Sequence, residues 1–360
     1  MERYSRDGLV FDVRDAGPPG GPVVVLLHGF PQRNDSWNAV IDRLTAAGYR
    51  CLAPNQRGYS PGARPPRRRD YRMSELVADV GALIDASGAQ RVHLVGHDWG
   101  AAVAWGVAAE LPDRLATVSP VSVPHPAAFL KALLTSRQGL ASWYMGFFQL
   151  PWLPEWLLTR GRGALAAKSL RRSGQTAAAA QRDARAMAEP GAMTGGLNWY
   201  RGLPLSNVRD SNQQIGVPTM YVWSDDDIAL KPKAARNTAR YVDADYRFEV
   251  LEGVSHWIPD TEPDRLADLL LDWFEAAADD FPQMQLLLRG RPGAEGGDYW
   301  QRLQPQVQRL QAAGRLRVED WKPAGQAFDD VDILVAPSPN PEVGPRVVME
   351  AMARGIPVIG

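Results

Sequence analysis

The sequence predicts an α/β fold in which helices cover both faces of a largely parallel sheet, with a helical insertion between two parts of that sheet. Three observations lead to this prediction. Short β-branched runs alternate with helical patterns in residues 1–126, aromatic and Leu/Ala-rich helical patterns without strands fill residues 127–213, and strands return in residues 214–279. Residues 280–360 continue beyond the point where this fold is complete.

The first part contains three clear strand patterns and one well-marked helix. Residues 23–29, VVVLLHG, predict a buried strand that runs into a turn, and residues 36–48 predict a helix that ends on glycine. Residues 49–55 and 91–97 predict further strands, each of which stops where polar residues begin.

The second part completes the same core. Residues 218–224 and 246–253 predict strands, and residues 265–278 predict the helix that follows them. A helical insertion at residues 127–213, between two halves of one sheet, is typical of a lid over an active site.

The composition limits the classes of partner and compartment. A formal net charge of −1 gives no electrostatic reason to expect a nucleic acid or an anionic membrane as partner. The single cysteine, Cys51, excludes an internal disulfide and fits a reducing compartment. The charged start of the chain lacks a signal-peptide pattern, and no apolar segment is long enough to span a bilayer. We therefore expect a cytoplasmic protein that neither crosses nor binds a membrane.

The candidate nucleophile is Asp98, at the centre of Gly96-His97-Asp98-Trp99-Gly100. This segment follows a predicted strand and precedes a predicted helix, and glycines stand two residues before and after the aspartate. Such a pattern is typical of a nucleophile elbow, in which tight backbone packing demands small residues. The alternative is that Asp98 only caps the following helix.

An aspartate at this position restricts the chemistry. Its attack on an ester or amide would form an anhydride, whereas its attack on a saturated carbon with a leaving group forms an alkyl ester. Water can then hydrolyse that ester at the carboxyl carbon of Asp98. The reaction needs a base to activate the water and an oxyanion hole for the second step.

His256 is the candidate base, because it lies in a loop after a late strand, third in the chain order of this type of site. The turn His28-Gly29-Phe30-Pro31 supplies the backbone N–H of Phe30, which can pair with that of Trp99 as an oxyanion hole. The histidines interpreted as packing or structural hydrogen-bonding groups are His93, His97 and His125.

The acid that orients His256 is expected after the strand at residues 218–224. Asp225, Asp226 and Asp227 all stand there. The third falls where the turn re-enters the core, so Asp227 is the predicted partner of His256. The other two are interpreted as capping or solvated residues.

The motifs HGFP, GHDWG, WSDDDIAL and GVSHW occur in this order, and together they make residues 1–278 resemble the epoxide hydrolase branch of the α/β-hydrolase family. The resemblance implies an α/β-hydrolase sheet with a helical lid. It also implies that water opens a small apolar epoxide to a vicinal diol without a cofactor or metal. Haloalkane dehalogenases resemble the same branch and share its Asp-His-Asp arrangement, so hydrolytic dehalogenation is the enzymatic alternative.

The leaving group distinguishes the two reactions, because an alkoxide needs O–H donors and a halide needs N–H donors. Tyr144 and Tyr200 resemble the two lid tyrosines of epoxide hydrolases and would stabilise the departing oxygen. Ordinary packing is the alternative role for both. The indoles of Trp99, Trp143 or Trp199 keep the dehalogenase alternative open.

Residues 280–360 resemble part of the nucleotide-sugar domain of a retaining glycosyltransferase with two Rossmann-like domains. Glu342 and Glu350 have the spacing of that family's E-x7-E motif, and EAMARGIPVIG follows in its context. The resemblance implies a partial Rossmann-like α/β fragment fused to a hydrolase. Because the acceptor half of such an enzyme is missing, we expect this fragment to be non-functional. A nucleotide-sugar binding role for the chain is the alternative from a different functional class.

Overall fold

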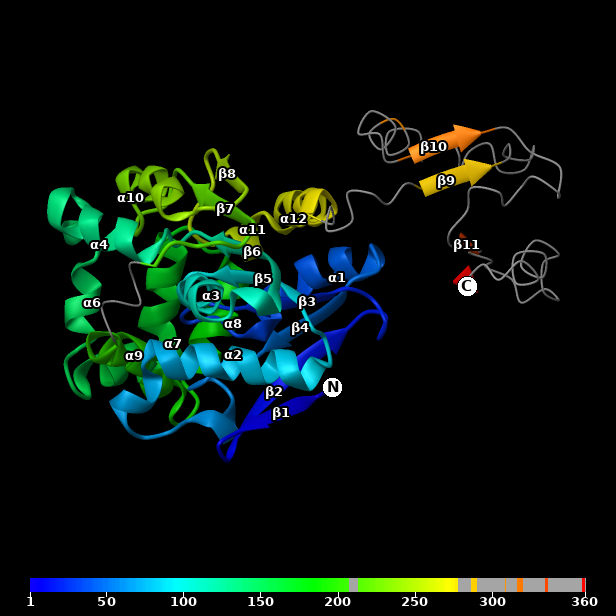
Figure 1. Ribbon diagram of the computed structural model, residues 1–360. Coiled ribbons are helices and arrows are strands. Elements are labelled where there is room, and N and C mark those ends of the chain that lie inside the picture. The colour runs from blue at the N-terminus through cyan, green and yellow to red at the C-terminus, as the bar shows by residue number, and fades with distance from the viewer. Residues whose placement is uncertain are drawn as a thin grey trace. The chain divides into compact units, whose positions relative to one another are not determined.

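The computed structural model describes residues 1–206 and 213–277, together with residue 308 and four short strands in residues 286–359. The chain divides into two units, Met1–Ala278 and Asp279–Gly360. The first unit contains the sheet, its covering helices and the insertion (Figure 1).

An eight-stranded sheet forms the centre of the first unit, in the order β1-β2-β4-β3-β5-β6-β7-β8. The β1–β2 and β2–β4 pairs are antiparallel, and every later pair is parallel. The strands are β1 (Arg3–Arg6), β2 (Leu9–Ala16), β3 (Val23–Leu27), β4 (Arg50–Pro54), β5 (Val92–His97), β6 (Leu115–Val121), β7 (Thr219–Ser224) and β8 (Tyr246–Leu251).

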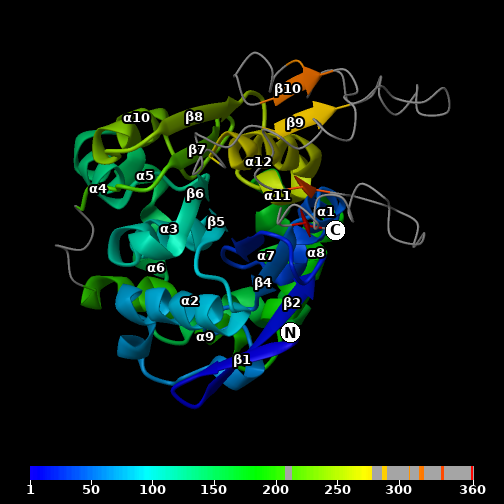
Figure 2. The same cartoon turned by 45° about the vertical axis from the view of Figure 1, so that its right-hand side comes forward.

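Helices cover both faces of the sheet, as Figure 2 shows. On one face, α1 (Asn38–Ala46) and α12 (Pro263–Ala277) share a buried apolar core with alternate residues of β3, such as Val24 and Leu26. On the other face, α2 (Met73–Ser87) and α3 (Trp99–Glu110) pack in a second core. All five residues of β3 are buried, as expected for a central strand covered on both sides.

Two short α-helices in the core and several 3₁₀ turns, one of them in the insertion, complete the described part of the first unit. The α-helices are α10 (Pro232–Asn237) and α11 (Ile258–Thr261). The 3₁₀ turns are Asn34–Trp37, Pro61–Ala63, Arg68–Tyr71, Pro112–Arg114, Leu203–Leu205 and Thr238–Tyr241. Within the described residues, no helix is both long and apolar enough to cross a bilayer.

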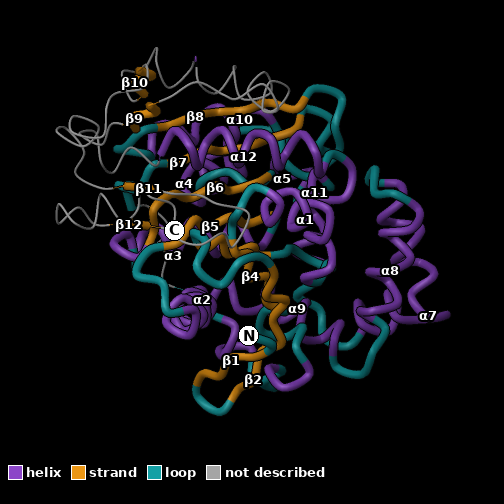
Figure 3. The backbone as a smooth tube through the Cα atoms, turned by 90° about the vertical axis from the view of Figure 1, so that its right-hand side faces the viewer, coloured by secondary structure: helices purple, strands orange, loops and turns teal. Residues whose placement is uncertain are grey.

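The insertion between β6 and β7 contains helices, with no strand in its described part. Figure 3 shows α7 and α8 together to one side of the sheet. The backbone of α7 is non-helical at residues 160–163, so this element consists of two helical segments joined by a kink. The helices are α4 (Pro126–Thr135), α5 (Gln138–Ala141), α6 (Trp143–Phe147), α7 (Leu153–Arg172), α8 (Ala177–Met187) and α9 (Ala192–Gly202).

The fold predicted for the first unit is confirmed as an α/β fold with a mostly parallel sheet. In the second unit, β9 (Leu286–Arg289) pairs in parallel with β10 (Leu316–Glu319), and β11 (Leu334–Val335) with β12 (Val358–Ile359). These two short strand pairs do not establish the predicted Rossmann-like fragment. The motif residues Glu342 and Glu350 lie outside the described residues.

Candidate active site

The turn between β5 and α3 places Asp98 in a backbone conformation that side chains rarely adopt, with φ 52° and ψ −118°. Close backbone contacts surround this turn. A Cβ atom on Gly96 would lie 2.2 Å from the carbonyl oxygen of Gly100, and one on Gly29 would lie 2.4 Å from the Cβ of Asp98. The glycines therefore allow the sharp turn that projects the carboxylate beyond the end of β5.

The carboxylate of Asp98 has a partner on each side. Its Oδ1 atom accepts a hydrogen bond from the backbone N–H of Phe30 at 2.8 Å, and its Oδ2 atom lies 3.5 Å from Nε2 of His256. Burial alone would raise the pKa of Asp98, but the hydrogen bond and charge of His256 lower it overall. Asp98 is therefore ionised at neutral pH.

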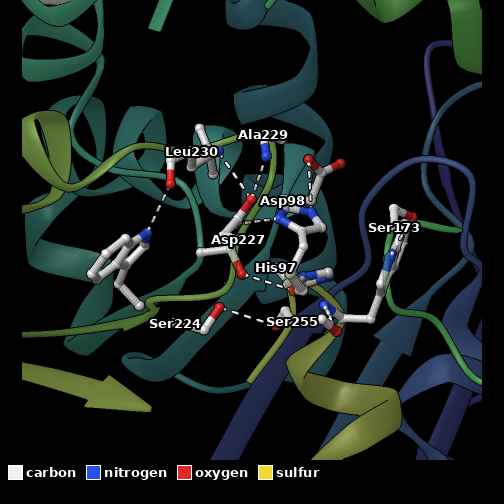
Figure 4. A network of polar contacts seen from close by, with 12 residues as sticks. His97, Asp98, Ser173, Ser224, Asp227, Ala229, Leu230 and Ser255 are labelled. Atoms are coloured by element: carbon white, nitrogen blue, oxygen red, sulfur yellow. Dashed lines mark hydrogen bonds and ion pairs between the residues drawn. The ribbon is translucent and has the colours of Figure 1, made fainter. Parts of the chain in front are cut away.

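Asp227 lies against the other side of the imidazole. Its Oδ2 atom is 2.7 Å from Nδ1 of His256, and its Oδ1 atom accepts backbone N–H bonds from Ala229 and Leu230 at 2.7 and 2.9 Å. Figure 4 shows these contacts around the buried Asp227 carboxylate. Asp225 is exposed and accepts from a backbone N–H instead.

The two carboxylates change the acidity of His256. Burial by itself would lower the pKa of this imidazole, but the charges and hydrogen bonds of Asp227 and Asp98 raise it to about 10. The two carboxylates therefore favour the protonated imidazolium between them. Loss of the charge on Asp98 would remove part of that effect and make the proton easier to lose.

A polar network that the sequence did not predict holds the loop carrying His256. The backbone carbonyl of His256 accepts a hydrogen bond from Oγ of Ser122 at 3.1 Å and lies 2.9 Å from Nε2 of His97. The Nδ1 atom of His97 is 2.9 Å from Oε1 of Gln32, whose amide donates to Asp260 at 2.7 Å. His97 therefore acts as the structural hydrogen-bonding group that its position suggested.

Tyr144 and Tyr200 approach the site from the insertion, on α6 and α9, with ring centroids 6.1 Å apart. They line the same cavity as Asp98 and His256, which has a volume of about 410 Å³. Burial first, and then the charge of Asp98, raise the pKa of both hydroxyls. Both tyrosines are therefore protonated and able to donate hydrogen bonds.

The rest of the cavity wall is mainly apolar and comes from the core and the insertion. This composition suits a small apolar molecule whose reactive end meets a few polar groups. Its apolar side chains include Phe30, Phe148, Leu158, Met187, Met193 and Ile228.

The tryptophans considered as halide ligands lie in different surroundings. The indole N–H of Trp199 donates to the carbonyl of Arg57 at 2.7 Å, so it is already occupied. Trp99 packs edge-on against Tyr200 with centroids 4.9 Å apart, and it lowers the pKa of that tyrosine through a hydrogen bond. Trp143 lines the cavity but is 70% exposed.

The remaining histidines have structural surroundings. His93 stacks on Phe274 with centroids 4.2 Å apart, and His125 stacks on Tyr241 and caps the start of α4. His28 lies 3.0 Å from the carbonyl of Gly29, within the turn that presents Phe30. In the part of the chain that the structure describes, no cluster of three or more His, Cys, Asp or Glu residues could hold a metal ion.

Comparisons with known proteins show to which family the chain belongs. The family model described as "alpha/beta hydrolase fold" matches residues 22–263. The chain is 34% identical to the AB hydrolase superfamily protein YfhM of Bacillus subtilis, covering 75% of this chain and 96% of the relative. It is 32% identical to epoxide hydrolase A of Mycobacterium tuberculosis, covering 74% and 94%, and 31% identical to human epoxide hydrolase 4, covering 74% and 76%.

A solved structure agrees with these relatives. The crystal structure of epoxide hydrolase A from Mycobacterium thermoresistibile superposes with a TM-score of 0.65 at 28% identity. The superposition covers 76% of this chain and 97% of that one. The chain is therefore a hydrolase that belongs to the alpha/beta hydrolase fold family.

Proposed function

We propose that the chain hydrolyses epoxides to vicinal diols through an ester of Asp98. In the first step a carboxylate oxygen of Asp98 forms a bond to an epoxide carbon, and the bond from that carbon to the ring oxygen breaks. The ring oxygen leaves as an alkoxide and receives a proton from Tyr144 or Tyr200. The raised pKa of both tyrosines falls as the charge of Asp98 is neutralised, so proton transfer becomes easier as the alkoxide forms.

In the second step water cleaves the ester at the carboxyl carbon of Asp98. Ester formation removes the charge that helped to keep His256 protonated, so the imidazolium releases its proton. That proton restores the tyrosinate left by the first step, and the neutral imidazole can act as a base. It then takes a proton from water while Asp227 stabilises the imidazolium that re-forms. The backbone N–H groups of Phe30 and Trp99 are the proposed oxyanion donors, and collapse of the intermediate releases the diol and restores Asp98.

The presence of both Tyr144 and Tyr200 in the cavity that contains Asp98 is the observation that favours an epoxide over a haloalkane. Hydroxyl donors match a departing oxygen, which must gain a proton, whereas a halide leaves without one. The occupied indole of Trp199 removes one of the halide ligands that the sequence suggested. The similarity to proteins named epoxide hydrolase supports the same substrate class.

The direct test is the intact mass of a His256→Gln variant after exposure to an aryl epoxide and, separately, to a bromoalkane. Without its base the enzyme should form the ester and hydrolyse it slowly. The proposal predicts a mass gain equal to the whole epoxide, located on Asp98 by peptide mapping. An Asp98→Ala/His256→Gln variant is the control and should gain nothing.

Two outcomes would contradict the proposal. A gain of only the alkyl group, from the bromoalkane alone, would make the chain a dehalogenase. A whole-epoxide gain located on another residue would remove Asp98 from the mechanism.

For residues 280–360 we keep the interpretation of a segment that resembles part of a nucleotide-sugar domain and has no activity. The hydrolytic proposal needs no residue beyond the first unit. Titration of the full chain with UDP- and GDP-sugars tests this interpretation. Saturable binding that disappears in a Glu350→Ala variant would overturn it.

A further inference from the structure

The charge of the chain is unevenly divided between the insertion and the rest. Residues 127–206 contain ten Lys and Arg residues but only three Asp and Glu residues. The rest of the chain contains thirty Lys and Arg residues and thirty-eight Asp and Glu residues. The net charge of −1 therefore combines a strongly basic insertion with an acidic remainder. The small net charge of the whole chain is therefore no argument against an anionic partner for the insertion.

The three carboxylates of residues 127–206 are all engaged in ion pairs. Glu155 pairs with the buried Arg201, Asp183 with its neighbour Arg182, and Glu189 with Arg33 of the core. Eight of the ten basic side chains are exposed. In the described residues, no carboxylate lies within 4.0 Å of these eight. These unpaired cations are Lys131, Arg137, Arg160, Arg162, Lys168, Arg171, Arg172 and Arg185.

Exposed apolar side chains gather in the same segment. Ten of the thirteen large apolar residues that are exposed in the described part of the chain lie between Leu130 and Leu205. They include Trp143, Trp152 and Trp156, and the last of these lies under the guanidinium of Arg160 at 5.0 Å. Exposed aromatic and aliphatic groups beside basic residues are the composition of a surface that binds a membrane interface.

The mouth of the active-site cavity lies among these exposed side chains. Leu140, Trp143 and Ile228 all line the cavity, yet they are 78%, 70% and 55% exposed, so they form its apolar rim. On α7, the exposed Ser169 also lines the cavity and lies between Lys168 and Arg172. The rim therefore combines apolar groups with neighbouring cations that have no carboxylate partner.

We propose that this surface, defined by Leu140, Trp143, Ile228, Lys168 and Arg172, docks on an anionic lipid bilayer. The cations meet lipid phosphates, and the apolar rim enters the boundary between headgroups and acyl chains. A second copy of the chain fits less well, because a symmetric contact would bring two positive rims together. Under the function proposed above, docking would open the cavity toward lipophilic epoxides dissolved in the bilayer.

Vesicle co-sedimentation of the full chain tests the docking without any substrate. We expect binding to vesicles of phosphatidylcholine mixed with phosphatidylglycerol, little binding to phosphatidylcholine alone, and loss of binding as salt is raised. Lys168→Gln/Arg172→Gln should weaken the binding roughly thirtyfold, since each cation near an anionic surface contributes about a fivefold factor. Trp143→Ser should weaken it about tenfold through lost apolar burial.

The matched control is Arg43→Gln/Arg114→Gln, which removes the same charge from two arginines outside the insertion that are paired with carboxylates. It should bind vesicles like the unaltered chain. Thermal unfolding verifies that each variant is folded, as expected for exposed side chains. A failure of docking leaves the mass experiment on Asp98 untouched, so the two proposals are tested separately.

Four results would overturn the docking proposal. They are equal binding to the two kinds of vesicle, no binding to either, an equal loss in the control variant, or tighter binding to duplex DNA with no effect of Trp143→Ser. A dimer seen by light scattering without vesicles, and lost in Trp143→Ser, would instead assign the surface to a contact between copies.

Discussion

The Nδ1 atom of His256 lies 2.7 Å from the Oδ2 atom of Asp227, and the backbone fixes that carboxylate in place. Its other oxygen accepts the N–H groups of Ala229 and Leu230, so rotation of the carboxylate would break three contacts at once. This arrangement holds the Nδ1 proton of the imidazole and directs Nε2 toward Asp98.

We therefore expect Asp227→Asn to slow hydrolysis of the ester by about 10⁴-fold, because an amide no longer fixes the correct tautomer of His256. Ester formation, which does not need the base, should be much less affected. Single-turnover kinetics with an aryl epoxide measure the two steps separately. Asp226→Asn, at an exposed neighbouring position, is the control and should keep full activity.

Removal of either tyrosine hydroxyl should slow the first step instead. Tyr144→Phe and Tyr200→Phe should each reduce the rate of ester formation by about 10²-fold, since one donor to the developing alkoxide is lost. The rate of ester hydrolysis should change little. Tyr246→Phe is a matched control, because its buried hydroxyl has no hydrogen-bond partner among the described residues. Equal loss in all three variants would contradict a role of the lid tyrosines in the reaction.

The turn that presents Asp98 should tolerate no Cβ at Gly100, where that atom would lie 2.2 Å from the backbone oxygen of Leu27. We expect Gly100→Ala to lower the free energy of unfolding by about 4 kcal/mol or more. Gly146→Ala, in helix α6 with nothing within 4 Å of the added atom, should raise it by about 0.5 kcal/mol. Urea denaturation compares the two variants, and a Gly100→Ala protein of normal stability would show that the turn has room to relax.

The free energy of unfolding should decrease as the pH rises from 6.5 to about 10. Although burial opposes it, Asp227 and Asp98 raise the pKa of His256 from its usual 6.5 to about 10. The folded state therefore holds a proton that the unfolded state releases, so this contribution is complete below pH 6.5 and is lost as the pH rises to about 10. Denaturation at a series of pH values should show the decline, and His256→Gln should remove it. An unchanged slope in the variant would place the titration elsewhere.

The central strands were predictable because both of their faces are buried. β3 is therefore a continuous apolar run, and β5 and β7 are largely apolar, which a sequence pattern detects. The hairpin of β1 and β2 was not predicted, because it lies at the edge of the sheet. There buried residues such as Tyr4 and Phe11 alternate with charged ones, and no apolar run marks the strands.

Only part of the candidate site, too, could be predicted from the sequence. Asp98 was proposed from the glycines of its sharp turn, and His256 from its place in a loop after a late strand, and the structure brings the two side chains together. The contacts of Ser122 and His97 with the carbonyl of His256 were not predicted, because they join residues 134 and 159 positions apart and involve a backbone atom. The basic surface of the insertion was also missed, because net charge carries no information about which side chains are exposed or paired.

The insertion is the whole connection between two neighbouring strands, since β6 pairs directly with β7 in parallel. The hydrogen-bonded ladder between those strands depends on the register of Val118 with Thr219 and of Val121 with Val222, and not on what the connection contains. Mutations in the connection can therefore reshape the cavity wall while the sheet that carries Asp98 and His256 is inherited unchanged. As long as Tyr144 and Tyr200 are kept, descendants of one ancestral enzyme can in this way diverge in substrate preference without losing the reaction.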